Sequence, residues 1–241
     1  MKLNFSIVAL ALIVQGALAQ DADAVDSTVV RAKKPDSLKV KFYPRSIRFG
    51  TDLITLVKGQ AQSNFSGWEV NGDVDCGKVY IAADLGSWGR SYQLPLNGNY
   101  DNQGTYWRFG ADVNLLKKDP DRNMFFVGVR FAHAAYHESS LIILSYPYFG
   151  DIQKVYDNTN VTASWGELTA GLRVRVWKEL WMGYTGRLKF AASVKGDTEI
   201  KSYDIPGYGV TAKGYTWGFN YQIFWRIPFM KEKKKAPTFP K

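Results

Sequence analysis

The sequence predicts an all-β fold, an eight-stranded antiparallel transmembrane β-barrel of the outer-membrane type. Three observations predict it. Apolar and polar residues alternate in runs of about ten residues, and turn-forming residues separate the runs, as in barrel strands. Short connections alternate with longer ones along the chain. One parity of each run is apolar and aromatic, whereas the other carries charges and amides, as the stretch Tyr215 to Phe229 illustrates.

The N-terminal segment, residues 1–19, has the order of a secretory signal peptide. Lys2 precedes an apolar run, Phe5 to Val14, and the small-residue motif "ALA" follows it. The apolar run is too short to span a bilayer as a helix. We therefore expect export and cleavage, with residues 20–45 forming an extended periplasmic leader and residues 230–241 a basic C-terminal tail.

Eight alternating runs lie between residues 46 and 229 and give the strands of the predicted barrel. In each run every second residue is apolar, and no charge interrupts that parity at the middle of the run. The apolar positions span Ile47–Val57, Trp68–Val74, Val79–Leu85, Trp107–Leu115, Phe125–Phe131, Leu168–Val176, Leu180–Phe190 and Tyr215–Phe229. An even number of strands is the rule for bacterial outer-membrane barrels, which supports the fold.

The connections between the runs fall into two classes. The short ones are Cys76–Lys78, Lys117–Asn123 and Lys178–Glu179, and the longer ones are Lys58–Asn64, Gly89–Gly104, Tyr136–Asn160 and Lys195–Val210. Outer-membrane barrels have short periplasmic turns and longer extracellular loops, so we expect the same orientation here.

The polar parity of the runs decides which face is inside. Alternation alone also fits a soluble calyx with an apolar interior. The bases of the polar parity, however, are almost all arginine, glycine recurs on it, and its acidic and basic residues gather on different strands, as expected for an enclosed ionic network. The predicted lumen network comprises Arg48, Asp52, Glu69, Asp73, Asp75, Asp84, Arg108, Asp112, Arg130, Glu167, Arg173, Arg175, Arg187, Lys189 and Arg226. An eight-stranded barrel is just wide enough for side chains to fill, so we expect a packed core and not a pore.

Several stretches carry a resemblance to a known family. They read "SIRFGTDLITLV", "FSGWEVNGDVDCGKVYIAADLG", "TYWRFGADVNLL", "MFFVGVRFA", "GELTAGLRVRVWKELWMGYTGRLKF", "DIPGYG" and "WGFNYQIFWRIPF". In this order they resemble an uncharacterised family of Bacteroidota outer-membrane β-barrel proteins. Such barrels are similar to the accessory integral barrel subunit (BamF-like) of the Bacteroidota barrel-assembly machinery. The resemblance implies an outer-membrane location and, as partners, outer-membrane lipids, the central insertase barrel and surface lipoproteins.

The third long connection contains an apolar and aromatic segment, Ser139 to Gly150, that is expected to leave the membrane. Exposed apolar patches usually mark partner-binding surfaces, so Leu141, Ile143, Tyr146 and Phe149 are candidate partner-docking residues. The alternative is that the flanking strands extend beyond the bilayer and bury the segment.

We predict no catalytic, cofactor-binding or metal-binding residue and no cofactor. His133 and His137 are four residues apart, but on a strand this spacing separates them by about 13 Å. The net charge of +9 is spread along the chain without a nucleic-acid-binding motif, so we expect no nucleic acid partner. The predicted function is that of a non-enzymatic structural or accessory subunit of an outer-membrane assembly, namely the barrel-assembly machinery. The alternatives are a stand-alone small barrel for envelope tethering or adhesion, and an outer-membrane enzyme.

Overall fold

The structure, a computed structural model, describes residues 43–95, 98–116, 123–148 and 150–229. The predicted signal peptide, the C-terminal tail and most of the leader lie outside these residues. The strands of the barrel are β1 (Ser46–Asp52), β2 (Phe65–Asp75), β3 (Val79–Gln93), β4 (Asn99–Asn114), β5 (Met124–Tyr146), β6 (Gly150–Trp177), β7 (Leu180–Lys195) and β10 (Tyr215–Pro228). One helix, α1 (Leu53–Ala61), and two short strands, β8 (Asp204–Ile205) and β9 (Gly209–Val210), complete the described elements.

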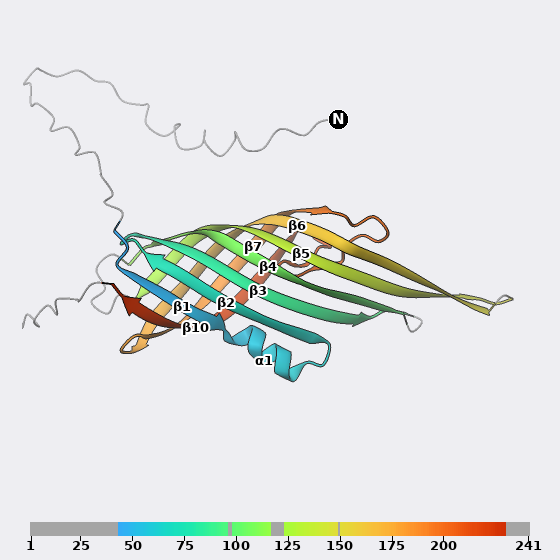
Figure 1. The fold of residues 1–241 in the computed structure, drawn as a ribbon, viewed down its shortest axis with the longest axis horizontal. Helices are drawn as coiled ribbons and strands as arrows, with labels where there is room; N and C mark the ends of the chain where they lie inside the picture. Colours follow the sequence, from blue (N-terminus) through green and yellow to red (C-terminus); the bar gives the residue numbers. More distant parts are fainter. Residues whose placement is uncertain (1–42, 96–97, 117–122, 149, 230–241) are drawn as a thin grey trace, which may run out of the picture. The chain divides into compact units, whose positions relative to one another are not determined.

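The eight long strands form a closed antiparallel barrel in the order β1-β10-β7-β6-β5-β4-β3-β2 (Figure 1). Strands β2, β4 and β6 end, and β3, β5 and β7 begin, at one end of the barrel, here called the inner end, whereas α1 lies toward the opposite, outer end. The predicted fold class is confirmed.

The outward-facing positions of the strands form an apolar belt. Exposed members of this belt are Phe49, Trp68, Val70, Leu85, Trp107, Phe109, Val113, Phe125, Val127, Val129, Phe131, Leu168, Leu172, Val174, Trp217, Phe219, Trp225 and Ile227. No described outward-facing position between these residues on the same strands is charged. The alternate positions point inward and are buried, which is the inverse of a soluble barrel.

The first strand is shorter than the alternation predicted. The run Ile47–Val57 was expected to be one strand, but β1 ends at Asp52 and α1 begins at Leu53. The side chain of Asp52 accepts hydrogen bonds from the backbone N–H groups of Ile54 and Thr55, which caps the helix. Because Leu53 and Val57 are also spaced by one helical turn, the apolar pattern there was ambiguous between the two structures.

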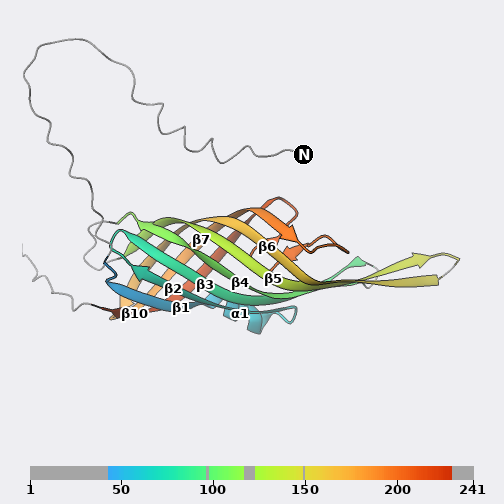
Figure 2. The same cartoon turned by 45° about the horizontal axis from the view of Figure 1, so that its top comes forward.

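Two predicted long loops consist mainly of strand. In Gly89–Gly104, β3 continues to Gln93 and β4 starts at Asn99. In Tyr136–Asn160, β5 and β6 continue as a hairpin that extends beyond the other strands in both views (Figures 1 and 2). The predicted strand ends follow from the alternation of apolar residues on the lipid-facing side. The backbone pairing between neighbouring strands continues beyond the last of these apolar residues.

Candidate functional site

The inner half of the lumen contains a chain of buried ion pairs. The Asp73 carboxylate accepts hydrogen bonds from Arg48 Nε at 2.8 Å and from Arg173 Nη1 at 2.6 Å. The Asp112 carboxylate accepts a hydrogen bond from Arg130 Nη2 at 2.7 Å and lies 3.8 Å from Arg173 Nη2. Since Arg173 on β6 reaches Asp73 on β2, this chain crosses the barrel interior and ties opposite walls together.

Aromatic rings pack around the same arginines. The guanidinium of Arg173 lies 4.7 Å from the ring centres of both Phe126 and Phe224. That of Arg48 lies 4.7 Å from the ring centre of Tyr80. Cation–π contacts of this kind are stronger in a site without water, so the rings both fill the inner half and favour the arginines' position there.

A second ionic cluster lies nearer the outer end. Arg108 contacts Glu69 at 2.8 Å and Glu167 at 3.1 Å. Arg187 on β7 contacts Glu167 at 3.0 Å and reaches across to Asp84 on β3, also at 3.0 Å. All five side chains are at most 5% exposed. Removing one member of a buried pair costs about 3–5 kcal/mol, because its partner stays buried without compensation.

The connection between β7 and β10 folds into the outer mouth of the barrel. We call its residues 202–210 the plug loop. Ile205 and Tyr208 are buried there, and the Tyr208 ring packs edge-on against Trp165. The Gly207 carbonyl accepts hydrogen bonds from Arg108 Nη2 at 3.1 Å and from Lys189 Nζ at 2.7 Å. The plug loop therefore covers the second ionic cluster on the side that faces the outer end of the barrel.

Asp204 fastens the plug loop to β3. Its carboxylate accepts hydrogen bonds from Arg90 Nη1 at 3.2 Å and from the Tyr92 hydroxyl at 2.8 Å. Burial raises the pKa of Asp204 above its usual value, although Arg90 and Tyr92 stabilise the charged form.

Glu138 links the plug loop to the base of the hairpin. This buried carboxylate accepts hydrogen bonds from the hydroxyls of Tyr100 and Ser202 and from the Asn158 amide, at 2.6, 2.7 and 2.9 Å. Asn158 also donates to the Ile200 carbonyl at 2.9 Å. The point where β5 and β6 leave the barrel is thus held by a polar network, which fixes the direction of the hairpin.

The structure places the predicted lumen residues as follows. Ten take part in the two ionic clusters: Arg48, Asp73, Arg173, Asp112, Arg130, Glu69, Arg108, Glu167, Arg187 and Asp84. Lys189 is buried and donates to plug-loop carbonyls. Asp52 caps α1, and Asp75 accepts the Gly77 N–H in the β2–β3 turn.

The two remaining predicted lumen residues lie at the inner rim. Arg226 Nε donates to Ser46 Oγ at 3.0 Å, and Arg226 is buried. Arg175 does not join the buried network. A register shift between Arg175 and Trp177 precedes the tight β6–β7 turn and leaves the Arg175 side chain 32% exposed, 4.0 Å from Glu179.

Sequence reasoning missed the plug loop, Glu138 and the aromatic part of the interior. Glu138 and Asp204 lay in stretches that were read as loops. The stretch "DIPGYG" was the available signal, because Ile205 and Tyr208 are apolar or aromatic residues in a predicted surface connection. Nothing in its local pattern says that it folds inward.

The candidate docking residues lie on the projecting hairpin. Leu141 and Ile143 continue the outward-facing parity of β5 and are half-buried, whereas Tyr146 continues the inward-facing parity and is exposed. Phe149 lies outside the described residues. Leu144, Ile152 and Val155 are further exposed apolar residues of the hairpin. From Ile142 to Tyr146, β5 pairs with β6 alone, so the other edge of β5 has no strand paired to it within the described residues.

One of the two histidines contacts the neighbouring strand β6. His133 Nδ1 lies 2.9 Å from Ser164 Oγ. Within the described ranges, no group of three or more His, Cys, Asp or Glu side chains is placed to hold a metal ion. None of the helical residues in those ranges forms a helix with the length and apolar character needed to cross a membrane.

Comparison with known proteins identifies the family. Residues 1–232 match the family described as "Domain of unknown function (DUF6048)", and the chain belongs to it. No curated protein matches the chain.

Two solved structures share a distant likeness in chain path. Both are described as crystal structures of Acinetobacter baumannii proteins. CarO2 has 9% sequence identity and a TM-score of 0.39, and the match covers 76% of this chain and 98% of CarO2. CarO has 9% identity and a TM-score of 0.37, with 78% of this chain and 98% of CarO covered. Values this low say nothing about what this chain binds.

Proposed function

We propose that this protein is a non-enzymatic integral outer-membrane barrel that acts as a structural, accessory subunit of a multi-protein assembly. The observation that carries the proposal is the β5–β6 hairpin, which presents apolar side chains beyond a barrel whose lumen is blocked by ionic clusters and by the plug loop. In this role the barrel is an anchor and the hairpin is the binding element.

The apolar belt supports a membrane location. An arginine at the bilayer midplane of such a barrel costs about 2–4 kcal/mol, and the described belt positions carry no charge. Trp68, Trp107 and Trp217 are the outermost belt residues of β2, β4 and β10, and Trp225 lies near the inner end of β10, as expected for residues at the two membrane–water interfaces. With the signal-peptide pattern of residues 1–19, this supports the outer membrane, with the inner end in the periplasm and the hairpin outside the cell.

The hairpin supports a binding role because its own two strands leave many of its apolar side chains exposed to solvent. Val155 is 67% exposed and Tyr148 is 94% exposed. An isolated two-stranded hairpin is at best marginally stable in water. A partner that covers one face would bury these side chains, and a few buried anchors usually contribute most of the binding energy.

The resemblance to the accessory barrel subunit of the Bacteroidota barrel-assembly machinery suggests which assembly this is. On that basis the partners are the central insertase barrel and surface lipoproteins. A surface lipoprotein above the outer leaflet would meet the hairpin, whereas a neighbouring barrel would meet the apolar belt.

Affinity purification in mild detergent tests the proposal. One variant replaces Leu141, Ile143 and Val155 with serine, a second replaces Leu144, Tyr146 and Ile152, and Gln153→Ser is the control on the same hairpin. The first three side chains lie on one face and the second three on the other. We expect one of the two triple variants to lose its co-purifying proteins while the control keeps them. Barrel stability should change little, because these residues lie outside the packed interior.

If both triple variants keep every partner, the hairpin is not the docking element. If the wild-type protein co-purifies with nothing and its loss leaves the outer-membrane proteome unchanged, the stand-alone barrel is the better description. A hydrolytic activity that persists in the isolated barrel would instead indicate an enzyme.

A further inference from the structure

The barrel wall is not closed by strand pairing along its whole height. On one side β1 pairs with β10 only as far as Asp52 and Gln222, and on the other it pairs with β2 as far as Thr51 and Val70. Beyond these points β10 continues over 215–221 and β2 over 65–69 without a strand between them. We call this part of the wall the seam, and α1 packs beside it against both strands.

Asp52 lies at the end of the seam that is nearer the inner end of the barrel. Besides capping α1, its carboxylate accepts hydrogen bonds from the Tyr221 backbone N–H and from Asn220 Nδ2, both at 3.0 Å. The side chain of Asp52 thus takes over the role of the missing strand backbone at the first unpaired position of β10. The seam is therefore a built feature with a polar boundary and not a frayed edge.

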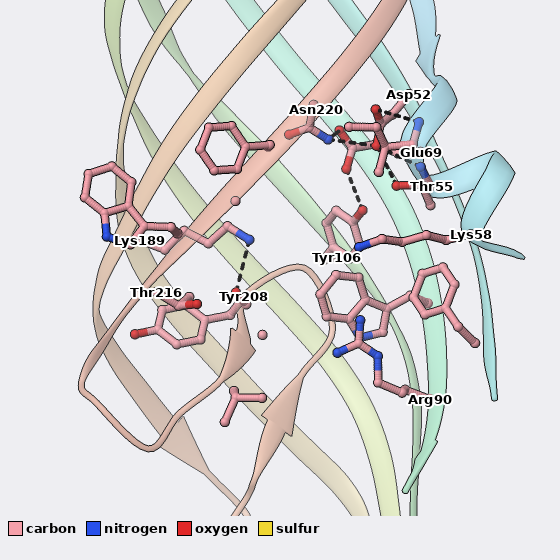
Figure 3. Close-up of a pocket in the computed structure, with 18 of the residues that line it drawn as sticks. Asp52, Thr55, Lys58, Glu69, Arg90, Tyr106, Lys189, Tyr208, Thr216 and Asn220 are labelled. Atoms are coloured by element: carbon pink, nitrogen blue, oxygen red, sulfur yellow. Dashed lines mark hydrogen bonds between the residues drawn. The ribbon is translucent and has the colours of Figure 1, made fainter. Parts of the chain in front are cut away.

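A cavity of about 510 Å³ lies at the seam (Figure 3). It is lined by the inward-facing Gly218 and Asn220 of β10 and also by the outward-facing Trp217 and Phe219 of the same strand. Because successive strand residues point to opposite faces, a cavity lined by four consecutive residues of β10 follows the unpaired edge of that strand. The cavity therefore lies along the edge where the lumen and the apolar belt meet.

The polar lining has a positive balance. Its charged members are Lys58, Arg90, Arg108, Lys189, Asp52 and Glu69. Arg108 is paired with carboxylates, and Lys189 donates to carbonyls. Lys58 is exposed and makes no side-chain hydrogen bond or ion pair within the described residues. Figure 3 shows Lys58 reaching into the cavity from α1 and Lys189 reaching in from the opposite wall.

The surroundings of the opening are apolar. Trp217 is 62% exposed and Phe219 is 70% exposed on the outer face of β10. Leu56 and Val57 of α1 are exposed as well. A molecule lying at the seam would thus meet cationic groups at one end and apolar side chains at the other.

We propose that the seam binds a membrane lipid with an anionic phosphate headgroup, which Lys58 contacts while the acyl chains stay against Trp217 and Phe219. This inference rests on the membrane location in the proposed function. The cavity volume is within the range of small-molecule sites, and it suffices for a headgroup rather than for a whole lipid. Inorganic phosphate is also anionic but would leave the apolar side of the seam unused.

Native mass spectrometry of the full exported chain in non-ionic detergent tests the proposal. The probes are phosphatidylglycerol, the zwitterionic phosphatidylcholine with the same acyl chains, and inorganic phosphate. We expect phosphatidylglycerol to bind the wild-type protein best. Lys58→Gln should weaken this binding about tenfold, the effect of losing one charge-assisted hydrogen bond. Lys78→Gln is the matched control, because Lys78 is also exposed but lies in the β2–β3 turn at the inner end.

A second pair of variants tests the cavity by volume. Ile54 of α1 lines the cavity, whereas Leu56 does not. Ile54→Trp should fill the cavity and reduce lipid binding, and Leu56→Trp should leave it unchanged. Equal binding of the two phospholipids, preference for inorganic phosphate, or unchanged binding by both Lys58→Gln and Ile54→Trp would overturn the proposal. The assay uses the barrel without its partners, so its failure is distinguishable from failure of the hairpin to bind proteins.

Discussion

Strands β5 and β6 pass through two environments, and the comparison shows what each half of the molecule needs. Inside the barrel, the inward parity of these strands carries Arg130, Glu167 and Arg173, which are all buried, and the outward parity is apolar. Beyond Ser140 both parities carry apolar side chains, and many of them are exposed. In the barrel half both edges of β5 and β6 are paired with neighbouring strands, whereas from Ile142 onward these two strands pair only with each other.

The difference indicates where binding and where stability reside. A buried ionic interior stabilises only if its charges are mutually compensated, and the two clusters achieve this across opposite walls. An exposed apolar hairpin contributes little to the stability of the free protein. Its residues become useful when another surface covers them.

The largest expected effect is the loss of a cluster member. Arg173→Leu should lower the free energy of unfolding by about 3 kcal/mol, the lower end of the range for a broken buried pair, because Arg48 still contacts Asp73. Leu172→Ala, one residue away on the outward face, should cost less because it opens no cavity in a packed core. The temperature at which the folded, heat-modifiable gel band disappears measures both.

If Leu172→Ala melts first, the assignment of the faces is wrong. The apolar parity would then be the packed core, and a soluble calyx would be the better description.

A smaller effect is expected from a glycine substitution that compares the plug loop with the hairpin. Gly207 and Gly150 both adopt positive φ angles, of 81° and 76°. A Cβ at Gly207 would lie 2.5 Å from the Tyr106 ring, whereas a Cβ at Gly150 would meet nothing within 4 Å. Both alanine variants incur backbone strain of about 1 kcal/mol. Gly207→Ala should therefore melt clearly below Gly150→Ala in the same gel assay. Equal melting would mean that the plug loop is not part of the packed interior.

The barrel was predictable because its determinants are local. Alternation places Arg187 inward and Leu188 outward whatever the rest of the chain does, and this parity was enough to select the interior. The ends of the strands were not predictable in the same way. The helix after Asp52 depends on a capping geometry, and the apolar spacing around Leu53 fits a strand and a helix alike.

The plug loop and the seam depend on contacts between distant parts of the sequence. Tyr208 is buried because Trp165 lies opposite it, and nothing near Tyr208 in the chain reveals this. The seam exists because β1 is shorter than β10, which becomes visible only when the strands are paired. For the hairpin segment, the alternative that the flanking strands extend through it agrees with the strand pairing up to Tyr146, but these strands leave Leu144 and Tyr146 exposed instead of burying them.

The central claim is that the charged interior is a packed core and does not conduct ions. In this account the barrel is a membrane anchor, and the hairpin binds the partner. Recording purified wild-type protein in planar bilayers tests the central claim most directly. The account predicts no steady channel of porin size, because the ionic clusters and the aromatic rings fill the inner half of an eight-stranded lumen and the plug loop closes its outer mouth. A reproducible, large, open state would contradict the account, since it would mean that the interior is a water-filled path.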